Sequence, residues 1–162
     1  MGQPSDATKM TRCVRADNLG SYDKNDFVDN KNGTIADKAT NLLWQQKDDG
    51  KPKVFKDAKK YCRKLNFAGR TDWRLPHLKE LISVMDYHKF RPAIDEAMFK
   101  EVKPDFYWSS TLDPAFGTKS MSGIIGSTDG IPRAWAVETL SGGAWKYQTT
   151  NPYPVRCVTD IK

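Results

Sequence analysis

The sequence holds few residues of the types that usually perform catalysis or bind transition metals. There are three cysteines, Cys13, Cys62 and Cys157, and two histidines, His77 and His88. The cysteines form no CxxC pair, and neither histidine has the spacing of a metal site or lies near a nucleophile pattern. We therefore predict no catalytic residue, no zinc site, no cofactor and no enzyme activity. The cysteines allow two interpretations: buried free thiols, or one disulfide and one cysteine left over.

One segment holds the oxygen ligands that calcium prefers in a tight turn. Asp29, Asn32 and Asp37 lie close together in the chain. However, Lys31 occupies a position where another acidic ligand would help, and the bidentate glutamate of a calcium loop is missing. The Asn-Gly dipeptide at Asn32 is instead typical of a two-residue turn in which both residues have positive φ. We therefore predict a hairpin over residues 27–37 and no metal.

Positively charged residues predict a different chemistry, the binding of anions. The chain has 26 Lys and Arg against 20 Asp and Glu, a formal net charge of +6, which favours anionic partners. Five cations fall on one face of a predicted helix over residues 54–66: Lys56, Lys59, Lys60, Arg63 and Lys64. A bound polyanion would relieve their mutual repulsion and release counterions. The alternative is an ordinary solvated helix face, the commoner role of a charged stripe.

Aromatic residues offer a second kind of contact with a ligand. Trp145 and Tyr147 follow a glycine-rich turn. Two interpretations are open for them: exposed rings that stack on the face of a sugar, or members of the core. Trp108 lies in a strand-like segment, Tyr107-Trp108-Ser109-Ser110-Thr111, and is predicted to be a core residue.

The elements that must position these residues follow from the hydrophobic pattern. Residues 54–66 have a helical period, a second helix is predicted to begin at Pro76, and a short third helix is predicted after Pro92. Besides the hairpin, the predicted strands are 41–46, 107–111, 133–139, 144–149 and 155–159. No stretch approaches the roughly 20 apolar residues that a membrane helix needs. Strands, then helices, then a β-rich half is the order of an α+β fold.

Two regions fall outside these elements. Residues 112–132 are predicted to form a long loop, and loops of that length in compact domains are usually functional or disordered. Residues 1–25 are predicted to be a leader, which leaves 26–162 as a single domain. Within the leader, Thr-Arg-Cys-Val-Arg at 11–15 is similar to Val-Arg-Cys-Val-Thr at 155–159. This similarity is either a coincidence or the end of a preceding repeat in a tandem array.

Four segments in series resemble one bacterial family, the C-terminal domain of the Legionella collagen-like adhesin. They are residues 27–37, Leu42 to Gln45, Ala68 to Pro76, and Tyr107 to Thr111 with the closing Val155-Arg156-Cys157-Val158. The resemblance implies a C-type-lectin-like fold, in which the N- and C-terminal strands pair and a long loop carries the binding surface. It also implies that Trp73 lies in the core, that Arg74 forms an internal pair and that Pro76 opens a helix.

The same resemblance implies secretion or surface display, so the expected location is extracellular, at the cell surface or periplasmic. It implies a disulfide between Cys62 and Cys157, which leaves Cys13 over. In the adhesin, the domain is associated with trimers and with sulfated glycosaminoglycans. We therefore expect a recognition or adhesion module that binds an anionic polysaccharide or a surface protein, with a homo-oligomer as one state and nucleic acid not among the partners. The alternative is a protein-binding or structural module that uses loop 112–132.

Overall fold

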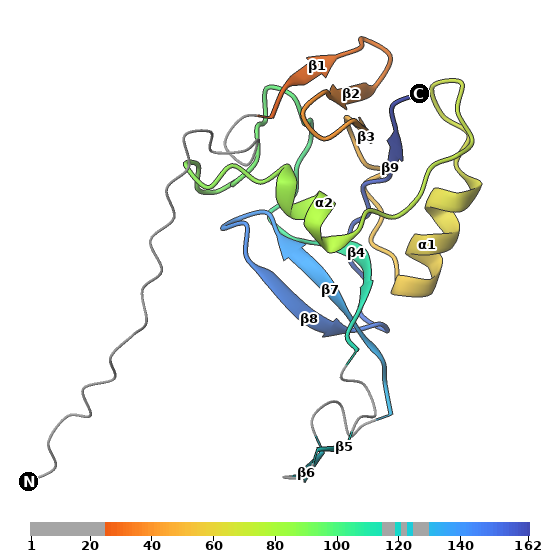
Figure 1. The fold of residues 1–162 in the computed structure, drawn as a ribbon, viewed down its shortest axis with the longest axis vertical. Coiled ribbons are helices and arrows are strands. Elements are labelled where there is room, and N and C mark those ends of the chain that lie inside the picture. The colour runs from red at the N-terminus through yellow and green to blue at the C-terminus, as the bar shows by residue number, and fades with distance from the viewer. Residues whose placement is uncertain (1–24, 115–118, 121–122, 125–129) are drawn as a thin grey trace, which may run out of the picture.

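Strands from both ends of the described chain form the first sheet, which has the antiparallel order β1-β2-β3-β9. The computed structural model describes residues 25–114, 119–120, 123–124 and 130–162. The four strands are β1 (Phe27–Asp29), β2 (Thr34–Asp37), β3 (Leu42–Gln45) and β9 (Val158–Asp160). Figure 1 shows the C-terminus beside this sheet, where β9 pairs with β3. The pairing of N- and C-terminal strands that the resemblance implies is therefore present.

The second sheet is built from the β-rich half of the chain. Its strands have the antiparallel order β4-β7-β8. They are β4 (Phe106–Leu112), β7 (Arg133–Glu138) and β8 (Ala144–Gln148), and they lie within two residues of the predicted bounds. Two short strands, β5 (Lys119–Ser120) and β6 (Gly123–Ile124), pair with each other. The α+β class is thus confirmed.

Two helices connect the sheets. The first, α1 (Phe55–Lys64), buries Phe55, Ala58 and Cys62. Their spacing of three and then four residues is that of the buried side of an amphipathic helix. The second, α2 (Leu78–Ser83), buries Leu81. No helix in the described part of the chain is long and apolar enough to span a membrane.

The start of α2 differs from the prediction. Pro76 lies before the helix, not at its first position, and His77 is the capping residue. The Glu80 carboxylate accepts a hydrogen bond from the His77 N–H at 2.7 Å, so the helix begins at the next residue.

Both faces of β3 and of the first half of β4 are buried, and their side chains divide between two hydrophobic clusters. Successive residues of a strand point to opposite faces. Trp44 and Tyr107 therefore belong to the cluster that includes the buried residue of α2, whereas their neighbours Leu43 and Trp108 belong to the cluster that includes those of α1. Trp73 is also buried in the second cluster, as predicted.

The hairpin forms with a turn different from the predicted one. Positive φ angles occur at Lys31 and Gly33, with values of 60° and 84°, and not at Asn32. The Asn32 side-chain oxygen instead accepts hydrogen bonds from the Thr34 N–H and hydroxyl, at 3.2 and 2.7 Å. This local side-chain bond replaces the backbone geometry of a two-residue turn, so the type that the dipeptide predicted was wrong.

The third predicted helix, after Pro92, is absent from the structure. Residues 95–99 form a single turn, closed by a hydrogen bond from the Phe99 N–H to the Asp95 carbonyl at 2.8 Å. The next amide, that of Lys100, donates to the Gln46 carbonyl at 2.9 Å. Because that amide bonds to a distant segment, the turn does not extend into a helix.

A disulfide joins Cys62 and Cys157, as the resemblance implies. Their Cα atoms are 5.6 Å apart, and the bond closes a separation of 95 residues. The last strand is shorter than predicted, because β9 begins at Val158 and Cys157 lies just before it. The Cys157 N–H donates to the side chain of Gln45 at 2.8 Å in place of a backbone carbonyl. The bridge ties α1 to the segment that leads into the last strand, an arrangement typical of the C-type-lectin-like fold.

Candidate functional site

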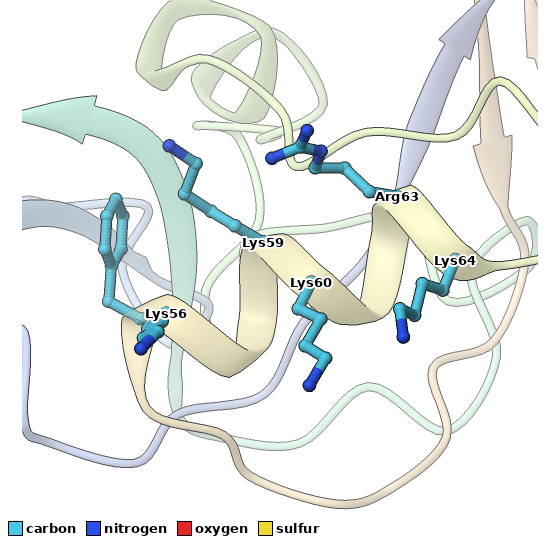
Figure 2. Close-up of a pocket in the computed structure, with 6 residues that line it drawn as sticks. Lys56, Lys59, Lys60, Arg63 and Lys64 are labelled. Carbon is cyan, nitrogen blue, oxygen red and sulfur yellow. The ribbon is translucent and has the colours of Figure 1, made fainter.

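The cations predicted for the first helix form one exposed surface of α1, here called the cationic face. Its members are Lys56, Lys59, Lys60, Arg63 and Lys64, all of which are exposed. Figure 2 shows Lys56, Lys60 and Lys64 directed to one side of the helix, and Lys59 and Arg63 to the other. The two rows arise because residues four apart lie on the same side of an α-helix.

The two rows border a shallow hollow of about 650 Å³. Phe55 also lines it, and the Lys59 ammonium lies 5.6 Å from the centre of the Phe55 ring. The opposite side of the helix is held in the core by Ala58 and by the Cys62 disulfide. Because that side is anchored, the orientation of the cationic face is set by the fold.

The charges of the cationic face are not neutralised by neighbouring residues. Within the part of the chain that the structure describes, none of the five cations forms a salt bridge, whereas Lys53 pairs with Asp49 at 2.6 Å and Arg70 with Asp72 at 2.7 Å. The helix carries one acid, Asp57, in its first turn. Lys53 and Arg70, which lie beside the helix, are therefore paired with acids, whereas the five cations of the cationic face are not.

This arrangement has a cost in helix stability. Like charges four residues apart destabilise a helix by about 0.2–0.5 kcal/mol per pair. The pairs in question are Lys56–Lys60, Lys60–Lys64 and Lys59–Arg63. The position of the last two cations, Arg63 and Lys64, in the final turn offsets part of this cost through the helix dipole. The face can bind an anion, which would remove the repulsion.

The two aromatic candidates have different environments. Trp145 is 58% exposed. Tyr147 packs against the rings of Phe106 and Tyr153, with centroids 4.7 and 5.1 Å away. Tyr147 is therefore half-buried at the edge of the second hydrophobic cluster, and Trp145 is the exposed ring of the pair.

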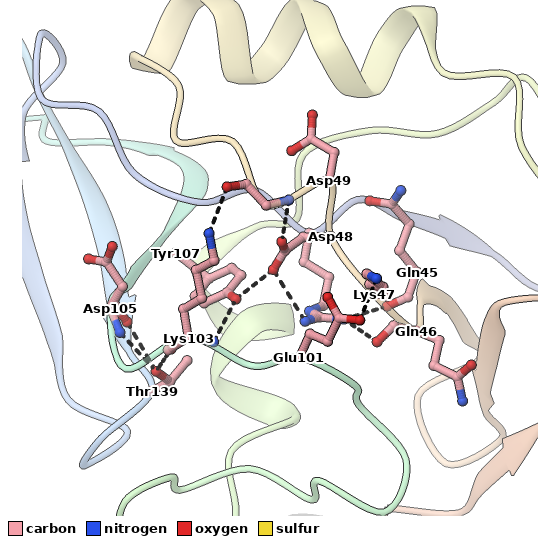
Figure 3. A network of polar contacts seen from close by, with 12 residues as sticks. Gln45, Gln46, Lys47, Asp48, Asp49, Glu101, Lys103, Asp105, Tyr107 and Thr139 are labelled. Atoms are coloured by element: carbon pink, nitrogen blue, oxygen red, sulfur yellow. Dashed lines mark hydrogen bonds and ion pairs between the residues drawn. The ribbon is translucent and has the colours of Figure 1, made fainter.

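A network of buried charges, which the sequence did not predict, lies between the sheets. Arg156 is 2% exposed, and its Nη1 donates to the carbonyls of Gln45 and Gln46 at 2.9 and 2.6 Å. Its Nη2 lies 3.5 Å from Asp48 Oδ2, which also accepts a 2.6 Å hydrogen bond from the Tyr107 hydroxyl. Burial raises the pKa of Tyr107 to about 12. Figure 3 shows how this network joins the end of β3 to β4, so its role is structural.

The histidines lie in separate places. His77 Nδ1 is 3.1 Å from the Ser110 hydroxyl oxygen, and His88 Nδ1 is 3.5 Å from the Asp86 carboxylate. Among the described residues, no three His, Cys, Asp or Glu side chains come together in a way that would hold a metal ion.

The calcium-like segment uses its oxygen atoms within the hairpin. Asp29 accepts hydrogen bonds from the N–H and the ammonium of Lys31, at 2.8 and 2.9 Å, and these lower the pKa of Asp29. Asp37 accepts from the Ala39 N–H and the Thr40 hydroxyl. The two carboxylates stabilise the turns at the two ends of β2.

Two predicted regions fall mostly outside the described residues. Of loop 112–132, residues 115–118, 121–122 and 125–129 are not described. The start of the loop is described. Leu112 is 50% exposed, and the Asp113 carboxylate lies 3.2 Å from the Lys146 ammonium. Residues 1–24, with Cys13 and the segment 11–15, also lie outside the described part. The roles predicted for these regions remain predictions.

Arg74 forms the internal pair that the resemblance implies. Its guanidinium donates to both oxygens of Glu80 at 2.7 Å and contacts Asp160 at 3.2 Å. Burial raises the pKa of Glu80, but hydrogen bonds from Arg74 and from the His77 N–H outweigh it, and the pKa is lowered overall. This pair holds the start of α2 against β9.

Comparison with known proteins identifies the family. Among solved structures, the chain is similar to the crystal structure of botrocetin, with a TM-score of 0.49 and 12% identity over 74% of this chain and 91% of that one. No curated protein matches the sequence. The family model described as the Lcl C-terminal domain matches residues 33–159, most of the chain. The chain therefore belongs to the family of Lcl C-terminal domains.

Proposed function

We propose that the chain is a non-enzymatic recognition or adhesion domain that binds a sulfated or acidic polysaccharide through the cationic face. Its family and its lectin-like architecture support a domain that binds carbohydrate or protein. One observation supports an anionic ligand: five exposed cations line one hollow, without a carboxylate partner among the described residues. A shared hollow of this kind differs from cations scattered singly over a surface.

The length of the cationic face supports a chain-like ligand. From Lys56 to Lys64 the helix rises about 12 Å, at 1.5 Å per residue. A small anion would contact two or three of the cations, whereas a linear polyanion can contact both rows. Each additional contact releases counterions, so the binding of a chain is expected to weaken steeply as salt is added.

The proposed location is extracellular, at the cell surface or periplasmic. The Cys62–Cys157 disulfide supports it, because disulfides persist in oxidising compartments. A homo-oligomer remains part of the proposal, since several copies of one cationic face would bind a long polysaccharide with avidity.

Heparin chromatography across a salt gradient tests the proposal. The test variant replaces Lys56, Lys60, Arg63 and Lys64 by Gln. A matched control removes the same charge elsewhere by replacing four other exposed cations by Gln: Lys38, Lys79, Arg91 and Lys100. We expect the native protein and the control to elute above physiological salt, with the control slightly earlier, and the test variant to elute much earlier. Equal shifts for the two variants would contradict the assignment of the site to α1.

A protein partner is the second candidate function. Trp145 is 58% exposed and Leu112 is 50% exposed, and Leu112 begins loop 112–132. Exposed apolar groups on both edge strands of the β-rich sheet support a protein contact. If the native protein and both variants pass through the heparin column at physiological salt, this second candidate becomes the better one.

A further inference from the structure

The groove beside the cationic face continues into a region of different chemistry. Lys60 and Lys64 line both the hollow of the cationic face and a neighbouring one of about 430 Å³. Tyr61 and Leu65 line that neighbour and a third hollow of about 390 Å³. Because each hollow shares lining residues with the next, the three follow one another along α1 towards the end of β3.

The third hollow, here called the polar hollow, is lined by groups that suit sugar hydroxyls. The rings of Tyr61 and Phe67 contribute aromatic surface, and Gln46 and Asp49 contribute an amide and a carboxylate. Its one exposed cation, Lys47, already pairs with Glu101. Aromatic surface with a few placed polar groups is typical of small-ligand sites.

Asp49 is held in a fixed position with acceptor capacity to spare. Its Oδ1 accepts from the Lys51 N–H at 3.1 Å and from the Lys53 ammonium at 2.7 Å, and its Oδ2 accepts from Lys53 at 2.6 Å. An ionised carboxylate has about four acceptor sites, so room remains for one more donor. Figure 3 shows the Asp49 side chain directed towards α1, the side on which Tyr61 borders the hollow.

The Tyr61 side chain is also held in position, by the same lysine that pairs with Asp49. The Lys53 ammonium lies 4.3 Å from the centre of its ring. Burial raises the pKa of Tyr61 above its ordinary value, so its hydroxyl is neutral at physiological pH and can donate or accept. The polar hollow therefore presents a ring and a carboxylate that are both fixed before any ligand arrives.

We propose that the polar hollow binds the uncharged, hydroxyl-bearing part of a sugar ring in the same polysaccharide whose acidic groups contact the cationic face. This inference rests on the proposed function. A hydroxyl donates to the Asp49 carboxylate, whereas a sulfate or phosphate at that place is repelled by it. The cationic face supplies attraction for any polyanion, and the polar hollow makes the domain select polysaccharides among polyanions.

The test compares two polyanions of matched charge at one ionic strength, a heparin oligosaccharide and polyvinyl sulfate, which has no sugar ring. Titration calorimetry on the disulfide-intact chain measures both dissociation constants. We expect the native protein to bind heparin more tightly. Tyr61→Leu is expected to weaken heparin binding about fivefold and to leave polyvinyl sulfate binding unchanged.

Two further variants separate recognition from folding. Tyr61→Phe keeps the ring and is expected to keep most of the preference for heparin. Asp49→Asn removes the repulsion and is expected to strengthen polyvinyl sulfate binding, an effect that a loss of structure would not produce. Thermal unfolding of each variant checks that the fold is retained.

The outcomes distinguish this inference from the proposed function. If the native protein binds both polymers equally, or if Tyr61→Leu weakens both to the same extent, the polar hollow does not select sugars, and the cationic face remains the proposed site. If the native protein binds neither polymer more tightly than the α1 Gln variant does, both the proposed function and this inference are wrong.

Discussion

The cationic face of α1 and the buried guanidinium of Arg156 carry the same charge in opposite surroundings. Arg156 has two carbonyl acceptors and the Asp48 carboxylate around it, and it is almost fully buried. The five cations of α1 are exposed and have no acid partner among the described residues. A buried charge must be compensated inside the protein for the chain to fold, whereas an exposed charge is compensated by water and ions. The cations available to a ligand are therefore those that the fold does not use.

The two regions are joined covalently. Cys62 lies on the buried side of α1, and Cys157 follows Arg156 in the chain. The largest predicted effect comes from breaking this link. Replacing both cysteines by Ala is expected to lower the free energy of unfolding by about 4–5 kcal/mol, the chain-entropy value for a loop of this length. Urea unfolding measures it. Reductant should destabilise the native protein similarly and leave the double variant unchanged; a double variant as stable as the native protein would contradict the prediction.

The next effect tests the buried charge directly. Arg156→Met leaves Asp48 buried without its counter-charge, and we expect a loss of about 3–5 kcal/mol in the free energy of unfolding. Lys60→Met, the matched change on the cationic face, is expected to alter it by less than about 0.5 kcal/mol. Chemical denaturation of the two variants compares them, and equal losses would remove the distinction between the regions.

A smaller effect of opposite sign is expected for the cationic face. Replacing Lys56, Lys60, Arg63 and Lys64 by Gln removes the like-charge pairs of α1 but also the favourable interaction of Arg63 and Lys64 with the helix dipole, so we expect a net gain in stability of less than about 1 kcal/mol at low salt. The gain should shrink as salt screens the charges. Thermal unfolding at two salt concentrations measures it. A variant less stable than the native protein at low salt would show that these cations support the fold.

The Arg74–Glu80 pair is intermediate in exposure between buried Arg156 and the cationic face, because both of its side chains are partly exposed. The folded pKa of Glu80 is lowered, so its contribution to stability is present above the unfolded pKa and is lost as the pH falls through the folded pKa. We expect Glu80→Gln to be less stable than the native protein at neutral pH, by less than about 1 kcal/mol because of the exposure. The two should converge in acid. Urea unfolding at several pH values tests this, and a difference that does not change with pH would contradict it.

The candidate site could be predicted because it depends on local periodicity. The spacing of Phe55, Ala58 and Cys62 specifies which side of the helix is buried, and the cations between them then face solvent. The strands of the β-rich half were found for the same reason, since alternation along a strand is also local. The type of the turn at Asn32 was missed because a hydrogen bond between two side chains competes with the backbone preference of the Asn-Gly dipeptide.

The sequence alone determined the α+β class, the position of α1 and the charge of its outer face, because each depends on residues within a few turns of one another. Tertiary structure decided the rest. Asp48 pairs with Arg156, and the Lys100 amide that ends the turn bonds to Gln46. The row of hollows from Lys64 to the polar hollow likewise brings together residues of different elements. Such contacts carry no periodic signal, because they exist only once the elements have packed together.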